Sequence, residues 1–365
     1  MGQWIYYIDV VGTCNLRCPS CPVGNFAKTD FLNEVRPNGF MDIDLFSQII
    51  QKIEHEAPAT AVVYFYNWGE PLLNPKLSEF IRYTKGRGLW CGLSSNLNIK
   101  PEMLEKAVAA YPDEFRISAS GLGSNTYEVT HRRGKTEILT ANMRHLRECI
   151  EKHKAPTKCH VLYHVYKNNV CDDLSAMIEL CRELNFELIP VWAYLMPLEK
   201  NLRYLSGQVS SEDKELIDRL TIDPREHQKL AVGMKNSPCS LQNSQMVINH
   251  DGSVPLCCAV YDPVYAIAPS FLDVSHEELQ ARKYRHDLCT TCMDAGGHIM
   301  ATYAVGEELD RMGNSVMRDA GSPYGIRNAR EIFSTNRSLR TMNRTARKSL
   351  RKVVRRLVSG SSVAK

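Results

Sequence analysis

The stretch GTCNLRCPSC at residues 12–21 is the most informative part of this 365-residue chain. Its three cysteines, Cys14, Cys18 and Cys21, have the spacing C-x3-C-x2-C. A closed structural zinc site needs four ligands, whereas three thiolates on a four-iron cubane cluster leave one iron with an open position. The pattern therefore indicates an iron–sulfur cluster whose open iron binds a small chelating molecule.

The cysteine stretch follows the first of six short runs rich in β-branched and aromatic residues, and segments with helical spacing separate the runs. The predicted strands are residues 4–10, 61–66, 90–94, 114–118, 158–166 and 186–193. The predicted helices are residues 76–85, 101–110, 137–153, 173–184 and a segment capped by Asp42 that places Leu45, Phe46, Ile49, Ile50 and Ile53 on one stripe. Six strand–helix units predict an α/β fold with a parallel sheet, an open and partial (βα)6 barrel.

Polar motifs follow the predicted strands at their carboxyl ends. The cysteine stretch follows the first strand, and Asn67-Trp68-Gly69-Glu70-Pro71 follows the second. Ser95-Asn96 and Ser118-Ala119-Ser120-Gly121 follow the third and fourth. Because chemistry in such barrels takes place at the carboxyl ends of the strands, we expect these motifs to form one site.

These motifs together resemble the radical S-adenosylmethionine (SAM) superfamily. The resemblance implies that a 4Fe–4S cluster on Cys14, Cys18 and Cys21 chelates the amino and carboxylate groups of SAM through its open iron. Reductive cleavage then gives methionine and a 5′-deoxyadenosyl radical, with electrons from a low-potential donor such as a flavodoxin or ferredoxin. One departure is Ser20, which stands where the family often has an aromatic residue near the adenine.

The resemblance also implies a set of SAM-binding residues. Gly69 and Glu70 match the family's Gly-Gly-Glu-Pro motif, in which Trp68 replaces the first glycine, and Glu70 is expected to accept hydrogen bonds from the SAM ammonium group. The other expected contacts come from Asn96, Ser118, Ser120, Arg133, for which Arg132 is an equal alternative, and the backbone of Val191. The alternatives are that Glu70 is a solvated loop acid, Asn96 a turn residue and the two serines caps.

A second cysteine group resembles the opening of the SPASM domain, in its shortened twitch form. Its ligands would be Cys239, Cys257, Cys289 and Cys292, and no cysteine follows them. The resemblance implies one fully ligated auxiliary 4Fe–4S cluster, which suits electron transfer. A zinc ribbon on the same four thiols is the structural alternative. Cys258 is either a thiol that binds no metal or a competing ligand, and His298 is a less favoured ligand. The remaining cysteines, Cys91, Cys149, Cys159, Cys171 and Cys181, are expected to be small buried hydrophobic residues.

The chain divides into four predicted parts. Residues 1–200 form the radical SAM barrel, 201–235 a helical connector, 236–300 the twitch-like domain and 301–365 a C-terminal extension with a basic amphipathic helix. Within the third part, Asn249-His250-Asp251-Gly252-Ser253 predicts a hairpin turn.

Charge is distributed unevenly along the chain. The formal net charge is +4, yet residues 331–365 contain ten Lys and Arg and a single acid, which leaves 35 basic and 40 acidic residues in the rest. Three interpretations compete for this tail: packing on the acidic body, docking on an anionic membrane surface, or contact with nucleic acid or an acidic partner. Nucleic acid is disfavoured because no aromatic residues are interleaved with the charges.

Composition and the termini limit the functional classes. Hydrophobic residues make up 44% of the chain and charged residues 24%, which is typical of a globular protein. No run approaches the roughly 20 apolar residues of a membrane span. The N-terminus shows no secretory signal, so we expect a cytoplasmic protein. The first strand begins by Trp4, so we expect no N-terminal peptide-recognition domain.

An auxiliary cluster beside a radical site suits an oxidation. We expect dehydrogenation of a sugar, cyclitol or glycan-linked substrate, by architectural analogy with a radical SAM aminocyclitol dehydrogenase. The alternatives are a peptide-modifying maturase and a non-catalytic iron–sulfur or zinc protein with a redox or regulatory role. The catalytic residues stay open; the candidates for a general base are His164, Tyr166, Tyr194 and Glu199.

Overall fold

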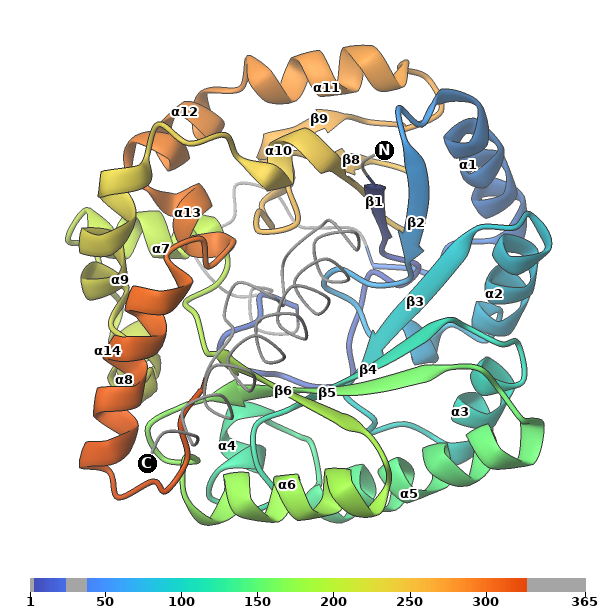
Figure 1. Ribbon diagram of the computed structural model, residues 1–365. Helices are drawn as coiled ribbons and strands as arrows, with labels where there is room; N and C mark the ends of the chain where they lie inside the picture. The colour runs from blue at the N-terminus through green and yellow to red at the C-terminus, as the bar shows by residue number, and fades with distance from the viewer. Residues whose placement is uncertain (1–2, 24–37, 327–365) are drawn as a thin grey trace, which may run out of the picture.

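A computed structural model describes residues 3–23 and 38–326 of the chain. Its centre is a curved sheet of seven strands in the order β6-β5-β4-β3-β2-β1-β7 (Figure 1). Every neighbouring pair in this sheet is parallel. The strands are β1 Gln3–Ile8, β2 Thr60–Tyr64, β3 Trp90–Ser95, β4 Glu114–Ala119, β5 Lys158–Val165, β6 Glu187–Trp192 and β7 Gln245–Ile248.

The predicted alternation of strands and helices is confirmed over the first six strands. The intervening helices are α1 Ile43–Glu56, α2 Leu77–Gly86, α3 Pro101–Val108, α4 Tyr127–Thr130, α5 Thr136–His153 and α6 Asp172–Glu183. Asp42 caps α1 as expected, because its carboxylate accepts the backbone N–H groups of Asp44 and Leu45. The buried stripe of α1 is Phe46, Ile49, Ile50 and Ile53, and Leu45 lies at its edge, partly buried.

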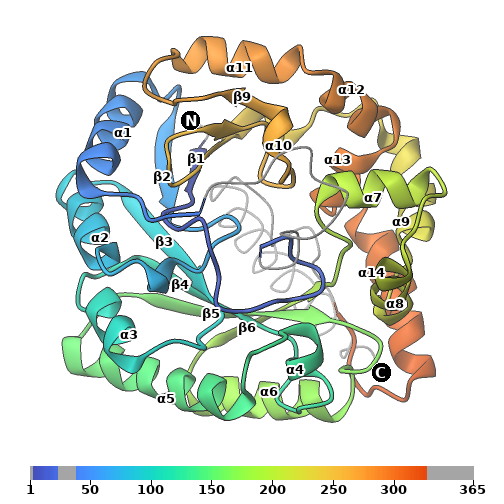
Figure 2. The same cartoon turned by 180° about the vertical axis from the view of Figure 1, so that it is seen from behind.

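The helices α1, α2, α3, α5 and α6 cover the convex face of the sheet (Figures 1 and 2). Alternate residues of each strand face either these helices or the barrel interior. In β1, Tyr6 and Ile8 belong to the main core with the helices. Ile5 and Tyr7 belong to a separate cluster with Tyr64 on the other face. The interior of the barrel is therefore lined by its own set of side chains.

The seventh strand was not expected from the sequence. Residues 249–253 do form the predicted turn, closed by a hydrogen bond of 2.9 Å from the Asn249 N–H to the Ser253 carbonyl. The two flanking segments do not pair as a hairpin, however. β7 joins the large sheet beside β1, whereas β8 Val254–Pro255 pairs antiparallel with β9 Ala266–Ala268. The expectation of a local hairpin was wrong on this point, because the apolar β7 gains more burial at the free edge of the parallel sheet.

The remaining helices complete the ring, most of them opposite α2 and α3 (Figures 1 and 2). They are α7 Leu198–Leu205, α8 Ser211–Arg219, α9 Pro224–Ala231, α10 Ser240–Ser244, α11 His276–Tyr284, α12 Asp287–Asp294, α13 Gly297–Ala301 and α14 Gly306–Asp319, with single 3-10 turns at Pro71–Leu73, Val232–Met234 and Pro263–Tyr265. The predicted basic helix falls outside the described residues. No helix within the described part is long and apolar enough to cross a membrane.

Candidate active site

The first cysteine group lies on the loop that follows β1. The Sγ atom of Cys14 accepts hydrogen bonds from the Leu16 N–H at 3.4 Å and from the Asn96 amide at 3.7 Å. Burial, together with nearby acidic groups, raises the pKa of Cys14. Burial also raises the pKa of Cys18, and the neighbouring thiols add to the effect. Donors aimed at a buried thiol fit a metal-bound thiolate, which must lose its proton when the metal binds.

Asp9 is a buried carboxylate that the sequence interpretation missed. It holds the motif after β2, residues 67–71, against the first cysteine loop. Asp9 is 1% exposed. Its Oδ1 accepts the N–H of Gly69 at 3.0 Å and that of Asn67 at 3.4 Å, and its Oδ2 accepts the N–H of Trp68 at 3.1 Å. The signal in the sequence was an acid at the end of an otherwise apolar strand, where an unpaired charge is costly.

Gly69 is needed at this junction for a steric reason. A Cβ atom on Gly69 would lie 1.8 Å from the carbonyl oxygen of Val11. The backbone at Gly69 therefore lies so close to the loop after β1 that only a residue without a side chain fits there. The next residue, Glu70, donates its N–H to the Thr13 carbonyl at 3.0 Å, which ties the two loops together.

The carboxylate of Glu70 is buried, with 3% exposure, beside the first cysteine group. Its two oxygens accept the N–H groups of Leu72 at 3.1 Å and Asn96 at 2.9 Å. Burial raises the pKa of Glu70 to about 7, although these hydrogen bonds oppose the shift. The Ser95 side chain also hydrogen-bonds this carboxylate. A buried carboxylate is suited to receive a cationic group, which would keep it ionised.

Asn96 connects the end of β3 to the first cysteine group. Its amide nitrogen donates to the Asn15 side chain at 3.0 Å, and Asn15 donates to the Asn98 carbonyl at 2.6 Å. Asn98 also donates to the hydroxyl of Tyr127 at 2.6 Å. Asn96 therefore takes part in a polar network that holds the cysteine loop in place.

The two predicted serines of the fourth strand region, Ser118 and Ser120, have different surroundings. Ser118 lies on the interior face of β4, in the same alternation as Arg116. The hydroxyl of Ser120 is fully buried and contacts Thr130 and His131, so it is already engaged within the protein.

The two arginines after α4 also differ. Arg133 is exposed and has a φ of +73°. Arg132 contacts the cysteine loop through its backbone, because its carbonyl accepts the Arg17 N–H at 2.9 Å. Its side chain forms an exposed ion pair with Glu212.

Three further predicted residues line the interior near the ends of β5 and β6. His164 pairs with Val191 across the two strands. Burial lowers the pKa of His164. Burial raises the pKa of Tyr166 to about 12, partly offset by a side-chain hydrogen bond with Ser20. Tyr166 thus lies against the position in the cysteine loop where the family often has an aromatic residue.

Deeper in the barrel, the interior wall is aromatic and charged, which the sequence interpretation did not anticipate. The guanidinium of Arg116 donates to the hydroxyl groups of Tyr64 and Tyr66. It also pairs with Glu114 at 3.0 Å. Tyr7 stacks on Tyr64 with ring centroids 5.5 Å apart. The signal was the two-residue spacing of Tyr64 and Tyr66 at the end of β2.

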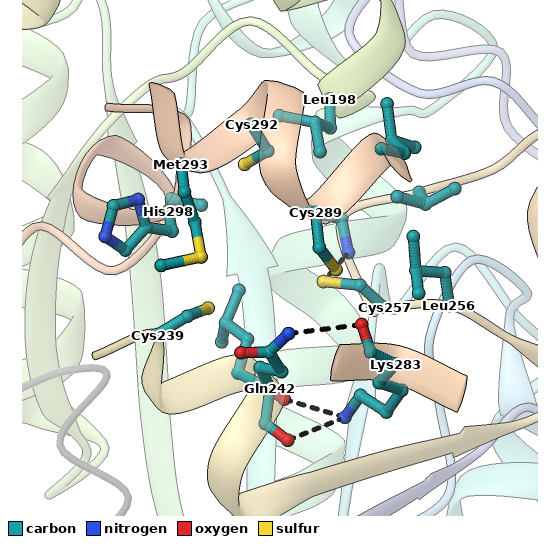
Figure 3. A pocket seen from close by; sticks show the side chains of 15 residues that line it. Leu198, Cys239, Gln242, Leu256, Cys257, Lys283, Cys289, Cys292, Met293 and His298 are labelled. Atoms are coloured by element: carbon teal, nitrogen blue, oxygen red, sulfur yellow. Dashed lines mark hydrogen bonds between the residues drawn. The ribbon is translucent and has the colours of Figure 1, made fainter. Parts of the chain in front are cut away.

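The four cysteines of the second group line a single pocket (Figure 3). Cys239 lies at the start of α10, Cys257 follows β8, and Cys289 and Cys292 come from α12. The remaining wall is largely apolar. All thirteen cysteines fall within the described residues, and none of them forms a disulfide.

A buried lysine, Lys283, forms part of the same pocket and is 2% exposed. Its ammonium group donates to the carbonyls of Leu241, Gln242 and Gln245 at 2.7–3.1 Å (Figure 3). Burial lowers the pKa of Lys283, while the nearby cysteines of the pocket oppose the shift. A fixed cation among four thiols fits an anionic metal–thiolate centre, since it compensates negative charge in a dry site.

Cys258 contacts its neighbour Cys257 but has different surroundings. Cys258 does not line the pocket, and its thiol donates to the Gln245 side chain at 3.4 Å. A hydrogen bond with Cys258 lowers the pKa of Cys257, against the effect of burial. On the interior side, Cys258 adds to the rise in the pKa of Tyr7 that burial causes. Cys258 therefore lies between the pocket and the barrel interior.

His298, Glu199 and the single cysteines, which were also named from the sequence, have the following contacts and burial. His298 lines the pocket and its Nε2 contacts the Ser237 carbonyl at 2.9 Å. Glu199 accepts the N–H groups of Tyr261 and Asp262, both at 2.8 Å, so it braces the loop after Cys258. The isolated cysteines Cys91, Cys149, Cys159 and Cys181 are buried as expected, and Cys171 is partly exposed.

Comparison with known proteins identifies the class. Residues 8–181 match the model of the Radical SAM superfamily. This range contains the first cysteine loop, Glu70 and Asn96, so this part of the chain is a radical SAM domain. The family implies a 4Fe–4S cluster and SAM, and the donors and buried carboxylate around the cysteine loop fit both.

One curated relative shares a stretch of sequence with the chain. It is the tungsten-containing aldehyde ferredoxin oxidoreductase cofactor-modifying protein of Pyrococcus furiosus, 32% identical over 103 residues. The match spans 28% of this chain and 26% of that protein, so it covers about a quarter of the relative's length.

One solved structure supports the fold, and two others have lower TM-scores. Streptococcus suis SuiB bound to the precursor peptide SuiA has a TM-score of 0.50 at 11% identity, covering 76% of this chain and 64% of that one. anSMEcpe with bound AdoMet and a peptide scores 0.48 at 18% identity, covering 80% and 86%. BtrN in complex with AdoMet and 2-DOIA scores 0.42 at 15% identity, covering 80% and 87%.

Proposed function

We propose that this enzyme oxidises a small hydroxylated substrate, a sugar, cyclitol or glycan-linked sugar, with an auxiliary 4Fe–4S cluster as electron acceptor. The ligands of that cluster would be Cys239, Cys257, Cys289 and Cys292. The observation that carries the proposal is that these four thiols, from three separate segments, line one buried apolar pocket with a lysine ammonium in its wall. Four thiol ligands complete a cubane and leave no iron open, which suits electron transfer.

The electron balance of the proposed reaction is simple. A 4Fe–4S cluster held by Cys14, Cys18 and Cys21, with SAM bound, would supply a 5′-deoxyadenosyl radical able to take one hydrogen atom from a carbinol C–H bond. The hydroxyl group of the resulting substrate radical loses a proton to a protein base or water. An auxiliary cluster held by Cys239, Cys257, Cys289 and Cys292 would accept the remaining unpaired electron, which would leave a ketone as the product. His164 and Tyr166 line the interior near the first cysteine loop and remain the candidates for the base.

The barrel interior supports a polar substrate. Tyr7, Tyr64 and Tyr66 offer aromatic faces and hydroxyl groups, and Arg116 and Glu114 offer charged donors and acceptors among them. Aromatic side chains bind the apolar face of a ring while polar groups fix its hydroxyls. A peptide substrate is the second candidate, because SuiB, which has a similar fold, was solved with a precursor peptide bound.

Metal content tests the auxiliary centre. After anaerobic reconstitution we expect about eight irons per chain, and about four in the double variant Cys239→Ala/Cys292→Ala. Cys258→Ser, whose side chain lies outside the pocket, is the matched control and should keep the full iron content. Four irons together with one zinc in the unaltered protein would overturn the two-cluster proposal.

Isotope transfer tests the substrate class. The reconstituted protein with reductant and SAM should release 5′-deoxyadenosine, and Cys18→Ala should not. With carbon-deuterated myo-inositol or N-acetylglucosamine, deuterium in the 5′-deoxyadenosine would identify a hydroxylated ring as a hydrogen donor. Deuterium transfer from deuterated short peptides, with none from either ring compound, would favour the peptide alternative.

A further inference from the structure

A cluster of metal-ligating side chains lies on the outer surface of the barrel, away from both cysteine groups. Glu105 of α3 and His145 and Cys149 of α5 each place one ligand atom within 4.8 Å of the others. Glu and His at such a distance are common on surfaces, but the third member is a cysteine that is 1% exposed. The cluster therefore combines a buried sulfur with two partly exposed ligands on two neighbouring helices.

The spacing along α5 explains how the ligands meet. His145 and Cys149 are four residues apart, so they lie on the same face of the helix one turn from each other. The distance from Cys149 Sγ to His145 Nε2 is 3.4 Å. Two such atoms bound to one tetrahedral zinc, at about 2.3 Å and 2.0–2.1 Å from it, are about 3.6 Å apart. The observed pair is thus within a few tenths of an ångström of the geometry that zinc requires.

Glu105 is held in place by further partners from α5. Its Oε1 contacts the ring of His153 at 3.1 Å and the ammonium of Lys152 at 2.6 Å. His153 is four residues beyond Cys149, on the same helix face. Because its ring contacts the Glu105 carboxylate, we assign it to orienting that ligand and not to binding the metal. A hydrogen bond from a histidine to a carboxylate ligand is a common way of orienting a metal ligand. Lys152 is largely exposed, so its side chain can move away when a metal cation binds.

We propose that Glu105, His145 and Cys149 form a zinc site that joins α3 to α5. Thiolate, imidazole and carboxylate together match the ligand preferences of Zn²⁺, which exceeds Fe²⁺ in affinity for such donors. Three protein ligands leave the fourth position to water. Burial and the nearby Glu105 carboxylate raise the pKa of Cys149 to about 11, so zinc binding at neutral pH releases a proton from the thiol.

Zinc binding to the iron-loaded protein tests the site. The reconstituted enzyme is passed over a chelating resin and titrated with zinc chloride against a chromophoric chelator, with iron measured in the same samples. We expect one zinc per chain in the unaltered protein and none at the same affinity in Cys149→Ser. Cys181→Ser, a buried single cysteine on α6, is the matched control and should bind zinc normally.

A surface variant keeps the test decisive if Cys149→Ser fails to fold. Glu105→Gln should lose zinc binding, whereas Glu102→Gln, an exposed acid of the same helix, should not. His153→Gln should weaken binding about 10–100-fold, as loss of an orienting partner does. Equal zinc binding by Glu105→Gln and the unaltered protein would overturn the proposal.

Discussion

Replacing Asp9 by Asn should uncouple the motif after β2 from the cysteine loop. In the structure, both oxygens of the buried carboxylate accept backbone N–H groups, from Gly69 at 3.0 Å, Trp68 at 3.1 Å and Asn67 at 3.4 Å. An amide has only one acceptor atom, so its NH2 group would face at least one of these donors. Hydrogen bonds to a charged group contribute about 1.5–3 kcal/mol each, and a buried unpaired donor costs a similar amount.

The expected loss in Asp9→Asn is therefore about 2–4 kcal/mol in the stability of this loop arrangement. Glu70, the expected SAM contact, follows Gly69 directly. SAM binding would therefore have to restore the loop position that Asp9 holds in the unaltered protein. Its dissociation constant should then rise by about 30-fold, and at most by about 1,000-fold. Equilibrium dialysis of SAM against the reconstituted protein measures this, with iron content as a check on the cluster.

The matched control is Asp42→Asn at the exposed start of α1. Its carboxylate also accepts two backbone N–H groups, at 2.7 Å and 3.1 Å, but Asn caps a helix as well as Asp does. SAM affinity should be unchanged in this variant. If Asp9→Asn binds SAM within threefold of the unaltered protein at equal iron content, the role assigned to Asp9 is wrong.

Three further outcomes are expected. Gly69→Ala should abolish release of 5′-deoxyadenosine, measured by chromatography, because the new methyl group would lie 1.8 Å from a backbone oxygen. Lys283→Met should lower the reduction potential of the proposed auxiliary cluster, measured by potentiometric electron paramagnetic resonance, since a buried positive charge favours the reduced centre. The pKa of His160 is lowered by burial but raised overall by Glu114 and Glu187. This ion-pair stability is complete below about pH 6.5 and is lost as pH rises through the higher folded-state value, so the thermal midpoint of His160→Gln should vary less over pH 6–9 than that of the unaltered protein.

Each of these outcomes can fail independently. A Gly69→Ala protein that still releases 5′-deoxyadenosine would mean that the loop after β1 moves easily. An unchanged potential in Lys283→Met would separate the lysine from the metal centre. Parallel pH profiles for His160→Gln and the unaltered protein would show that the histidine pairing contributes no net stability, as is common for partly solvated ion pairs.

The repeating units and the first cysteine group were predictable from the sequence, because both depend on local patterns. A strand that alternates every two residues and a helix that repeats every 3.6 residues leave a periodic record. Asp42 and the stripe of α1 were found in this way. Three cysteines within eight residues restrict the metal chemistry without any tertiary information, since the loop itself brings the ligands together.

The partners of the motifs were not predictable in the same way. Asp9 is separated from its three donors by about sixty residues, so its place at the end of an apolar strand marks it as unusual but does not show which groups it binds. The placement of β7 beside β1 likewise depended on which sheet edge was open. The hairpin expectation was wrong because turn chemistry specifies a reversal of the chain and not the strand that each arm pairs with.

The sequence alone determined the class of chemistry, through three closely spaced thiols at the end of the first strand of a βα repeat. Only the tertiary structure decided which groups surround them. It brought Glu70 and Asn96 to the cysteine loop, gathered four distant thiols around Lys283, and placed a cysteine, a histidine and a glutamate together across two helices. The physical reason is that such contacts are long-range: they depend on how the faces of separate elements pack, and packing leaves no periodic signature in the chain.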